Sequence, residues 1–174
     1  MVRMSELVAR ELHWVQPSSM KQYYELQAGD VAVCTLHLES SFNSRATAVT
    51  ADGSFEFDRK GFWQRQSTIR AAGGMEDIAL YNANTWRQGG TLVLPNGRTY
   101  MVKSNFWSTQ FYVTTQDEQP LISITKIGGV FHYSGNVEIL SLAKNLPELP
   151  WLVPFAWYLV MLQFRDSASA AAAT

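Results

Sequence analysis

The hydrophobic and polar positions of this chain follow one pattern through residues 12–141 and another through residues 149–164. In the first part, short runs of alternating or β-branched residues are separated by turn residues, which is typical of consecutive antiparallel strands. Phe55 and Phe57, for example, alternate with polar neighbours. Strands of this kind have one apolar face, and we expect those faces to point into a common core.

These runs predict about a dozen strands. Two turns between them are strongly indicated, because Asp-Gly and Asn-Gly tolerate the positive φ angles that two-residue hairpins need. They are Asp52-Gly53 and Asn96-Gly97. A weaker break is expected at Gly135. The candidate strands are residues 12–16, 21–26, 30–38, 45–50, 54–59, 62–70, 77–82, 90–94, 98–104, 110–115, 120–127, 130–134 and 136–141.

The second part of the pattern carries no charge between Glu148 and Arg165. We expect a helix over residues 152–164, with Pro150 and Pro154 at or before its first turn, where no backbone donor is needed. It lacks a polar stripe, so it must be buried on all sides. Even the whole apolar stretch would be only roughly 24 Å long, shorter than the ~30 Å hydrocarbon core, which favours a core helix over a membrane span.

A run of strands without crossover helices predicts a sandwich or a closed barrel. A barrel of about a dozen strands is too wide for its own side chains to fill, and the apolar helix is available to fill it. The predicted fold is therefore mainly β, an antiparallel closed barrel of about 12 strands that encloses a hydrophobic C-terminal helix. We expect one domain over residues 1–166 and a disordered low-complexity tail over residues 167–174.

Composition narrows the classes of function. The formal charge of -1 provides no broad positive field, so nucleic acid is not expected as a partner. The single cysteine, Cys34, excludes an intramolecular disulfide and fits a reducing compartment. The first residues contain charges among short apolar pieces and lack the features of an export signal. We therefore expect a cytoplasmic protein, peripheral at the membrane if it meets one, and not an integral membrane protein.

Few residues suggest chemistry. His13, His37 and His132 are spread over three strands without metal-ligand spacing, and Cys34 stands in an apolar run where a thiol behaves as a small hydrophobe. Neither a nucleophile elbow nor a phosphate-binding glycine loop is present in the sequence. We expect no enzyme activity, no catalytic residue, no metal and no cofactor.

The strand order resembles that of the tubby-like superfamily, in particular the LURP-one-related proteins and the phospholipid scramblases. The residues that carry the resemblance are the segment 97–103, the pair Phe106-Trp107, residues 111–113, and the apolar stretch 149–164. The resemblance implies a twelve-stranded barrel wound around a hydrophobic helix, and a link to phospholipid or phosphoinositide headgroups. No binding residue of these families is carried over to this chain.

One local excess of basic residues is a candidate binding site. Arg59, Lys60 and Arg65 lie close together in the sequence with Phe62 and Trp63, a combination able to contact anionic headgroups. The alternative interpretation is a solvated strand face with its aromatic residues turned inward. Two further tryptophans stand near turns and could lie at a barrel mouth instead of in the core, and these are Trp86 and Trp107.

Three hypotheses for function follow. The first is a non-enzymatic module that binds a lipid or a protein partner. The second is a carrier of small molecules resembling a lipocalin. It requires an empty lumen with a volume on the order of several hundred Å3, which is typical of ligand sites. The third is a soluble head anchored to a membrane by residues 149–164.

Overall fold

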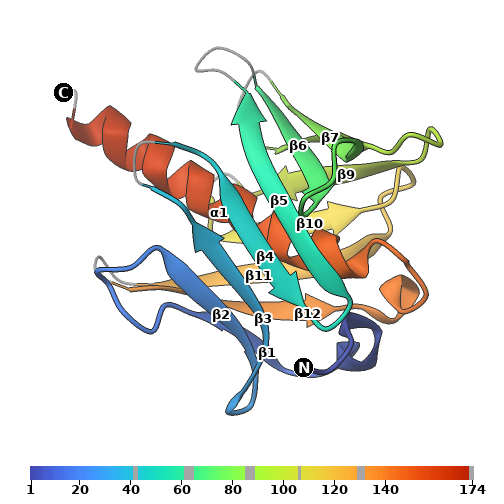
Figure 1. The fold of residues 1–174 in the computed structure, drawn as a ribbon, viewed down its shortest axis with the longest axis horizontal. Coiled ribbons are helices and arrows are strands. Elements are labelled where there is room, and N and C mark those ends of the chain that lie inside the picture. Colours follow the sequence, from blue (N-terminus) through green and yellow to red (C-terminus); the bar gives the residue numbers. More distant parts are fainter. Residues whose placement is uncertain (41–42, 61–64, 85–88, 106, 129–131, 173–174) are drawn as a thin grey trace.

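Twelve antiparallel strands close into a barrel in the computed structural model (Figure 1), which confirms the predicted fold class. The structure describes residues 1–40, 43–60, 65–84, 89–105, 107–128 and 132–172. Each strand pairs with the next in sequence, and the last pairs back with the first. The strands are β1 (Leu12–Val15), β2 (Tyr23–Ala28), β3 (Val31–Leu38), β4 (Ala46–Thr50), β5 (Gly53–Lys60), β6 (Gln66–Ala71), β7 (Asp77–Ala83), β8 (Gly89–Val93), β9 (Thr99–Ser104), β10 (Gln110–Thr114), β11 (Pro120–Gly128) and β12 (Tyr133–Ile139).

The helix α1 (Leu149–Ala172) passes through the inside of this barrel (Figure 1). Its apolar side chains contact strands on different sides of the barrel. The indole of Trp157 stacks on that of Trp14 in β1, and the ring of Phe155 meets Phe57 of β5 and Tyr81 of β7 edge-on. The helix thus provides the centre of the core, as predicted. The lumen that a lipocalin-like carrier would need is occupied, and the segment that a membrane anchor would place in lipid is enclosed by strands.

The helix is longer than predicted at both ends, since residues 152–164 were expected and the structure has Leu149–Ala172. Pro154 lies inside it, where the missing N–H removes one backbone hydrogen bond. Beyond the predicted end, the hydroxyls of Ser167 and Ser169 donate to carbonyls four residues earlier, and alanine has the highest helix propensity. The expected disordered tail is therefore helical as far as Ala172. Among the described helices, none has a stretch long and apolar enough to cross a bilayer.

The last strand also differs from the prediction, because β12 continues through Gly135 where a break was expected. A Cβ atom at this position would lie 2.7 Å from Cζ3 of Trp157 and 3.2 Å from the carbonyl oxygen of Thr125. The glycine therefore makes room for the helix and does not form a turn. The two predicted hairpins are confirmed, with φ of 146° at Gly53 and 83° at Gly97.

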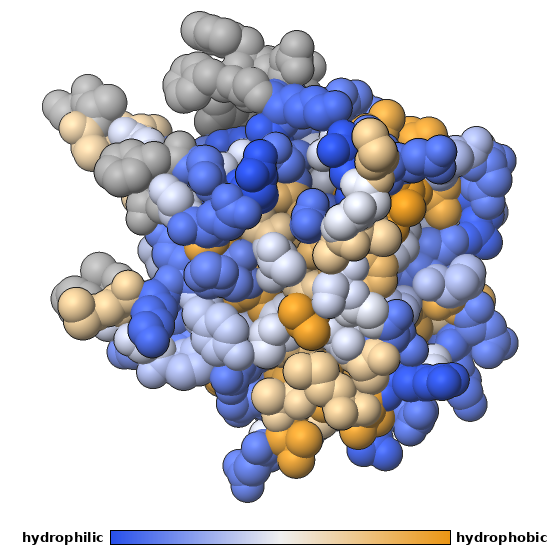
Figure 2. Space-filling view, viewed as in Figure 1, coloured by the Kyte–Doolittle hydropathy of each residue, from blue (hydrophilic) through white to orange (hydrophobic). Residues whose placement is uncertain are grey.

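Two short 3-10 helices lie outside the strands, η1 (Met4–Leu7) before β1 and η2 (Ser141–Ala143) before α1. Met4 and Leu7 of η1 are fully buried, and the backbone N–H of Met4 donates to Oδ2 of Asp52 at 3.1 Å. The N-terminal segment thus covers one end of the barrel. The outer wall is mostly hydrophilic in the view of Figure 2, with apolar residues in smaller groups.

Candidate functional site

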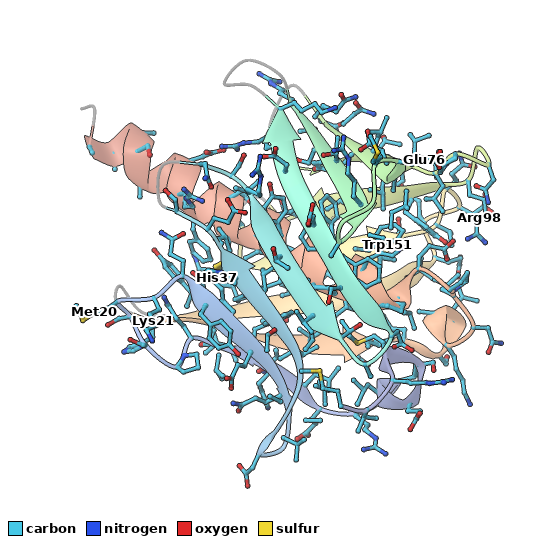
Figure 3. All side chains as sticks on the ribbon, viewed as in Figure 1. Met20, Lys21, His37, Glu76, Arg98 and Trp151 are labelled. Atoms are coloured by element: carbon cyan, nitrogen blue, oxygen red, sulfur yellow. The ribbon has the colours of Figure 1, made fainter. Side chains whose placement is uncertain are left out.

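The two ends of the barrel differ in charge. We call them the entry end and the exit end, after the points where α1 enters and leaves the barrel. Strands of a meander reverse direction at each connection, so alternate connections lie at the same end. The entry end, where α1 begins, carries the connections β2–β3, β4–β5, β6–β7, β8–β9 and β10–β11. The exit end, where α1 leaves, carries the other six strand connections. Figure 3 shows Met20 and Lys21 at the exit end, far from Glu76 and Arg98 at the entry end.

Charge is separated along the barrel axis, although the formal charge of the whole chain is only -1. Basic side chains outnumber acidic ones among the described residues of the exit end, and the reverse holds at the entry end. The exit end carries Lys21, Arg45, Arg59, Lys60, Arg65, Lys126 and Arg165 against Glu39, Asp58 and Asp166. The entry end carries Glu6, Glu11, Asp30, Asp52, Glu76, Asp77, Asp117, Glu118, Glu138 and Glu148 against Arg3, Arg10, Arg70, Arg98 and Lys144, of which Arg70 is paired with Asp77.

The structure places Arg59, Lys60 and Arg65, the three candidate headgroup contacts, on one hairpin of the exit end. Lys60 is the last residue of β5, and Arg65 directly precedes β6. Both are exposed, and Nη1 of Arg65 donates to the carbonyl of Asn84 at 3.2 Å. Phe62 and Trp63, which the sequence analysis grouped with them, lie outside the described residues.

Arg59 is held differently from its two neighbours. Its guanidinium donates two hydrogen bonds to the carboxylate of Asp166 in α1, at 2.8 and 3.1 Å. The hydrogen bond to Asp166 raises the pKa of Arg59, against the opposing effect of burial. Of the three candidate contacts, Lys60 and Arg65 are therefore the more exposed.

Arg165 is a residue of this end that the sequence analysis did not select. Its Nη2 donates to the carbonyls of Ser40 and Asn43, each at 3.0 Å. Burial lowers the pKa of Arg165, and the nearby Arg59 lowers it further. Two guanidinium groups therefore lie together where α1 leaves the barrel. The signal in the sequence was a charged pair, Arg165 and Asp166, directly after the apolar stretch and at the end of the predicted domain.

Apolar side chains are also exposed at the exit end. Trp107 in the β9–β10 connection is 78% exposed, which agrees with the expectation of a tryptophan at a barrel mouth. Met20 in the β1–β2 connection is 94% exposed, and Ile127 near the end of β11 is 48% exposed. Trp86, the other tryptophan considered for a mouth, lies outside the described residues. The exit end thus combines positive charge with large exposed apolar groups.

The remaining candidates do not form a site. Within the described residues, no group of three or more His, Cys, Asp or Glu side chains could hold a metal ion. Cys34 is fully buried, and burial raises the pKa of its thiol well above the usual range. An open groove of about 410 Å3 on the outer wall includes His13, whose Nδ1 is 2.5 Å from Oδ1 of Asn136. Its rim carries Arg10, Glu11 and Glu138, so it has no strong preference for either sign of charge.

A closed antiparallel barrel with a helix in its centre defines the class of fold, and a comparison with solved structures found a structure with a similar fold. It is an X-ray structure of an Arabidopsis thaliana protein, AT5G01750, with a TM-score of 0.56 and 7% sequence identity. The similarity covers 95% of this chain and 97% of the other. No family model and no curated protein matches the sequence. At this identity the likeness concerns the fold alone.

Proposed function

We propose that this protein is a non-enzymatic, cytoplasmic module of the LURP-one-related and tubby-like type that binds anionic phospholipid surfaces through the exit end of its barrel. The separation of charge between the two ends is the observation that carries the proposal. The fold shared with the Arabidopsis protein and the sequence pattern around residues 97–113 support the family part. A shared fold is weak evidence for a shared function, so the proposal depends mainly on the charge distribution.

Electrostatics favour one orientation on an anionic membrane. Each Lys or Arg near such a surface contributes about 1 kcal/mol of attraction, which decays within a Debye length of about 10 Å. The acidic entry end lies at the far side of the barrel and is repelled. A chain with almost no net charge can therefore bind an anionic surface, provided that it presents the exit end.

Lys60 and Arg65 are the proposed first contacts with headgroups. Both are exposed: Lys60 ends β5 opposite Gln66 in the β5–β6 register, and Arg65 directly precedes Gln66. Asp58, the acidic neighbour on β5, accepts a hydrogen bond from the hydroxyl of Ser44 at 3.3 Å, so its carboxylate is directed to the protein. Arg59 and Arg165 add positive potential behind them. The site thus provides charge to headgroups without a built pocket for one particular lipid.

The test is flotation of the full chain with vesicles of phosphatidylcholine alone or mixed with phosphatidylserine. We expect co-migration with the mixed vesicles at low salt and weaker binding as salt increases. The double charge reversal Lys60→Glu with Arg65→Glu should reduce affinity by at least about tenfold, because it reverses two attractive terms of about 1 kcal/mol each.

A matched control separates local from global charge. The variant Arg10→Glu with Lys144→Glu makes the same change in net charge with exposed residues of the entry end. It should bind vesicles as the unmodified protein does, and circular dichroism should show both variants folded. Equal losses for the two variants would contradict the proposed orientation. Absence of binding to the mixed vesicles at low salt would reject the lipid proposal in favour of a protein partner.

A further inference from the structure

We infer that Trp107 and Met20 insert into the membrane interface and anchor one side of the exit end, while the basic hairpin attracts the surface from the other side. This inference rests on the proposed function, and it identifies the apolar contact of the same site. It assigns the β1–β2 and β9–β10 connections to membrane contact, in addition to the β5–β6 hairpin of the proposed function. The occupant is a phospholipid surface.

The positions of the exposed apolar residues carry the first step. Strands β9, β10, β11, β12 and β1 are consecutive neighbours around the barrel, so the β9–β10, β11–β12 and β1–β2 connections are adjacent at the exit end. Hydrogen bonds join them: Lys126 N–H donates to the carbonyl of Thr109 at 2.8 Å, and Tyr133 N–H donates to Oε1 of Gln16 at 3.2 Å. We call the side chains of Met20, Trp107 and Ile127 the apolar arc.

The opposite side of the same end carries most of the exposed charge. The β3–β4 and β5–β6 connections are neighbours, and they hold Arg45, Lys60 and Arg65, which we call the basic arc. Glu39 lies 3.9 Å from Arg45 and offsets part of its charge, so Lys60 and Arg65 carry most of the positive charge of this arc. The exit end is therefore divided into an apolar arc and a basic arc around the emerging helix. The basic arc provides long-range electrostatic attraction, and the apolar arc provides short-range contact with lipid. Because the two arcs lie at the same end of the barrel, both can act on one flat membrane surface.

The chemistry of the apolar arc fits a membrane interface. Tryptophan has a large apolar ring with one polar N–H, and it is enriched at the level of lipid headgroups. Methionine is flexible and adapts to an irregular surface. Lys21 directly follows the exposed Met20, so a cation flanks this member of the arc. The ammonium of Lys126, next to Ile127 in the sequence, lies instead 3.6 Å from the ring centroid of Phe164 in α1. A positively charged surround favours an anionic bilayer over an apolar surface without charge.

The chain offers a matched control for insertion. Met75 is 93% exposed, almost as much as Met20, but it lies at the entry end directly before Glu76 and Asp77. If exposure of a methionine were sufficient, both would enter lipid. Charge complementarity predicts that only Met20 does so. Cys34 is fully buried, so a thiol-reactive probe reaches a cysteine introduced at either position in preference to it.

The experiment attaches a nitroxide spin label to Met20→Cys and to Met75→Cys in the full chain, and measures its accessibility to a water-soluble relaxation agent. With phosphatidylserine-containing vesicles, we expect strong protection of the label at position 20 and none at position 75. Trp107→Ala should lower vesicle affinity by about tenfold, as expected for loss of a buried tryptophan. That loss should persist at high salt, where the electrostatic contribution is screened.

The outcomes distinguish this inference from the proposed function. Vesicle binding without protection at position 20, and with no loss for Trp107→Ala, would overturn the inference and leave the electrostatic proposal intact. Protection at position 75 alone would overturn both, since the entry end would face the membrane. Absence of vesicle binding would likewise reject both.

Discussion

The guanidinium of Arg59 at the end of β5 forms a two-point ion pair with the carboxylate of Asp166 in α1. The two residues are 107 positions apart in the sequence, and their side chains are each about one-third exposed. The pair fastens the exit side of the helix to the barrel wall. Close by, the hydroxyl of Tyr158 donates to the carbonyl of Ser44 at 2.8 Å, so the helix is held by polar contacts where its apolar part ends.

The first prediction concerns the stability of this fastening. A double-mutant cycle of Arg59→Gln and Asp166→Asn should give a coupling energy of about 0.5–1.5 kcal/mol, above the usual value for exposed pairs because the contact is bidentate and partly buried. Urea denaturation of the four proteins measures it. A coupling energy near zero would show that solvent replaces the pair at no cost.

A second prediction follows if the exit end binds anionic lipids. The carboxylate of Asp166 accepts the hydrogen bonds of the Arg59 guanidinium that a lipid phosphate would otherwise accept. Asp166→Asn removes this competing charge and should therefore increase affinity for phosphatidylserine vesicles. Glu39→Gln, which removes a similar charge from the same end, is the matched control. It should have a smaller effect, because Glu39 makes only one exposed contact of 3.9 Å with Arg45, whereas Asp166 holds Arg59 by two hydrogen bonds. In an Arg59→Gln background, the advantage of Asp166→Asn over Glu39→Gln should disappear. Equal gains from the two substitutions in both backgrounds would argue for a simple effect of net charge.

The third prediction concerns Gly135 and Trp157. Gly135→Ala should destabilise the protein by about 1–3 kcal/mol, because the added methyl group overlaps the indole of Trp157 in a packed core. In a Trp157→Phe background the same substitution should cost less, because the clashing atoms of the larger ring are gone. Thermal or urea denaturation of the three variants decides it. The idea would be abandoned if the cost of the alanine were the same in both backgrounds.

The fourth prediction concerns the start of α1, where the carboxylate of Glu148 is buried. It pairs with Arg98, and the hydroxyl of Tyr100 donates to its Oε2 at 3.2 Å. Arg98→Ala should cost about 1–3 kcal/mol, because a buried carboxylate loses its cation. Adding Glu148→Gln to Arg98→Ala should restore part of this stability, since no buried charge is left unpaired. A further loss in the double variant would contradict this explanation.

The fifth prediction concerns alkaline pH. Burial raises the pKa of Tyr24 to about 12 and raises the pKa values of Tyr81 and Tyr158 further. Above pH about 10 the unfolded chain loses phenolic protons that the folded protein keeps, so the free energy of unfolding should fall as pH increases. Urea denaturation over this range measures the slope. Part of the phenolate absorbance should therefore appear only together with unfolding, because Tyr81 and Tyr158 keep their protons in the folded protein.

The local parts of the fold could be predicted from the sequence. Alternation correctly placed Phe57 inside, the dipeptides ending in Gly53 and Gly97 marked two hairpins, and the absence of a polar stripe predicted a helix buried on all sides. The role of Gly135 could not be predicted from local pattern. A side chain at this position would overlap the indole of Trp157, and that residue lies far away in the sequence. Its neighbours show only an ordinary turn-like composition.

The candidate site was predicted only in part, because the sequence analysis looked for charge in one continuous stretch. Lys60 and Arg65 were found, since they are close in sequence. Lys21 and Arg45 were missed, because they join the same end of the barrel only through the reversal of the meander. Once a closed meander is predicted, adding the charges of alternate connections would have indicated the basic end. The pairing of Arg59 with Asp166 would still have required coordinates.

The position of α1 also affects how the protein is made. A ribosome releases all twelve strands before the segment that fills them, so their inner apolar faces wait without a partner for a period on the order of seconds at usual rates of synthesis. Until α1 is made, the apolar inner faces of the strands are exposed to solvent, and exposed apolar surface of this kind is what chaperones bind. Folding of the barrel is accordingly expected only once α1 has been synthesised, and not strand by strand as the strands emerge.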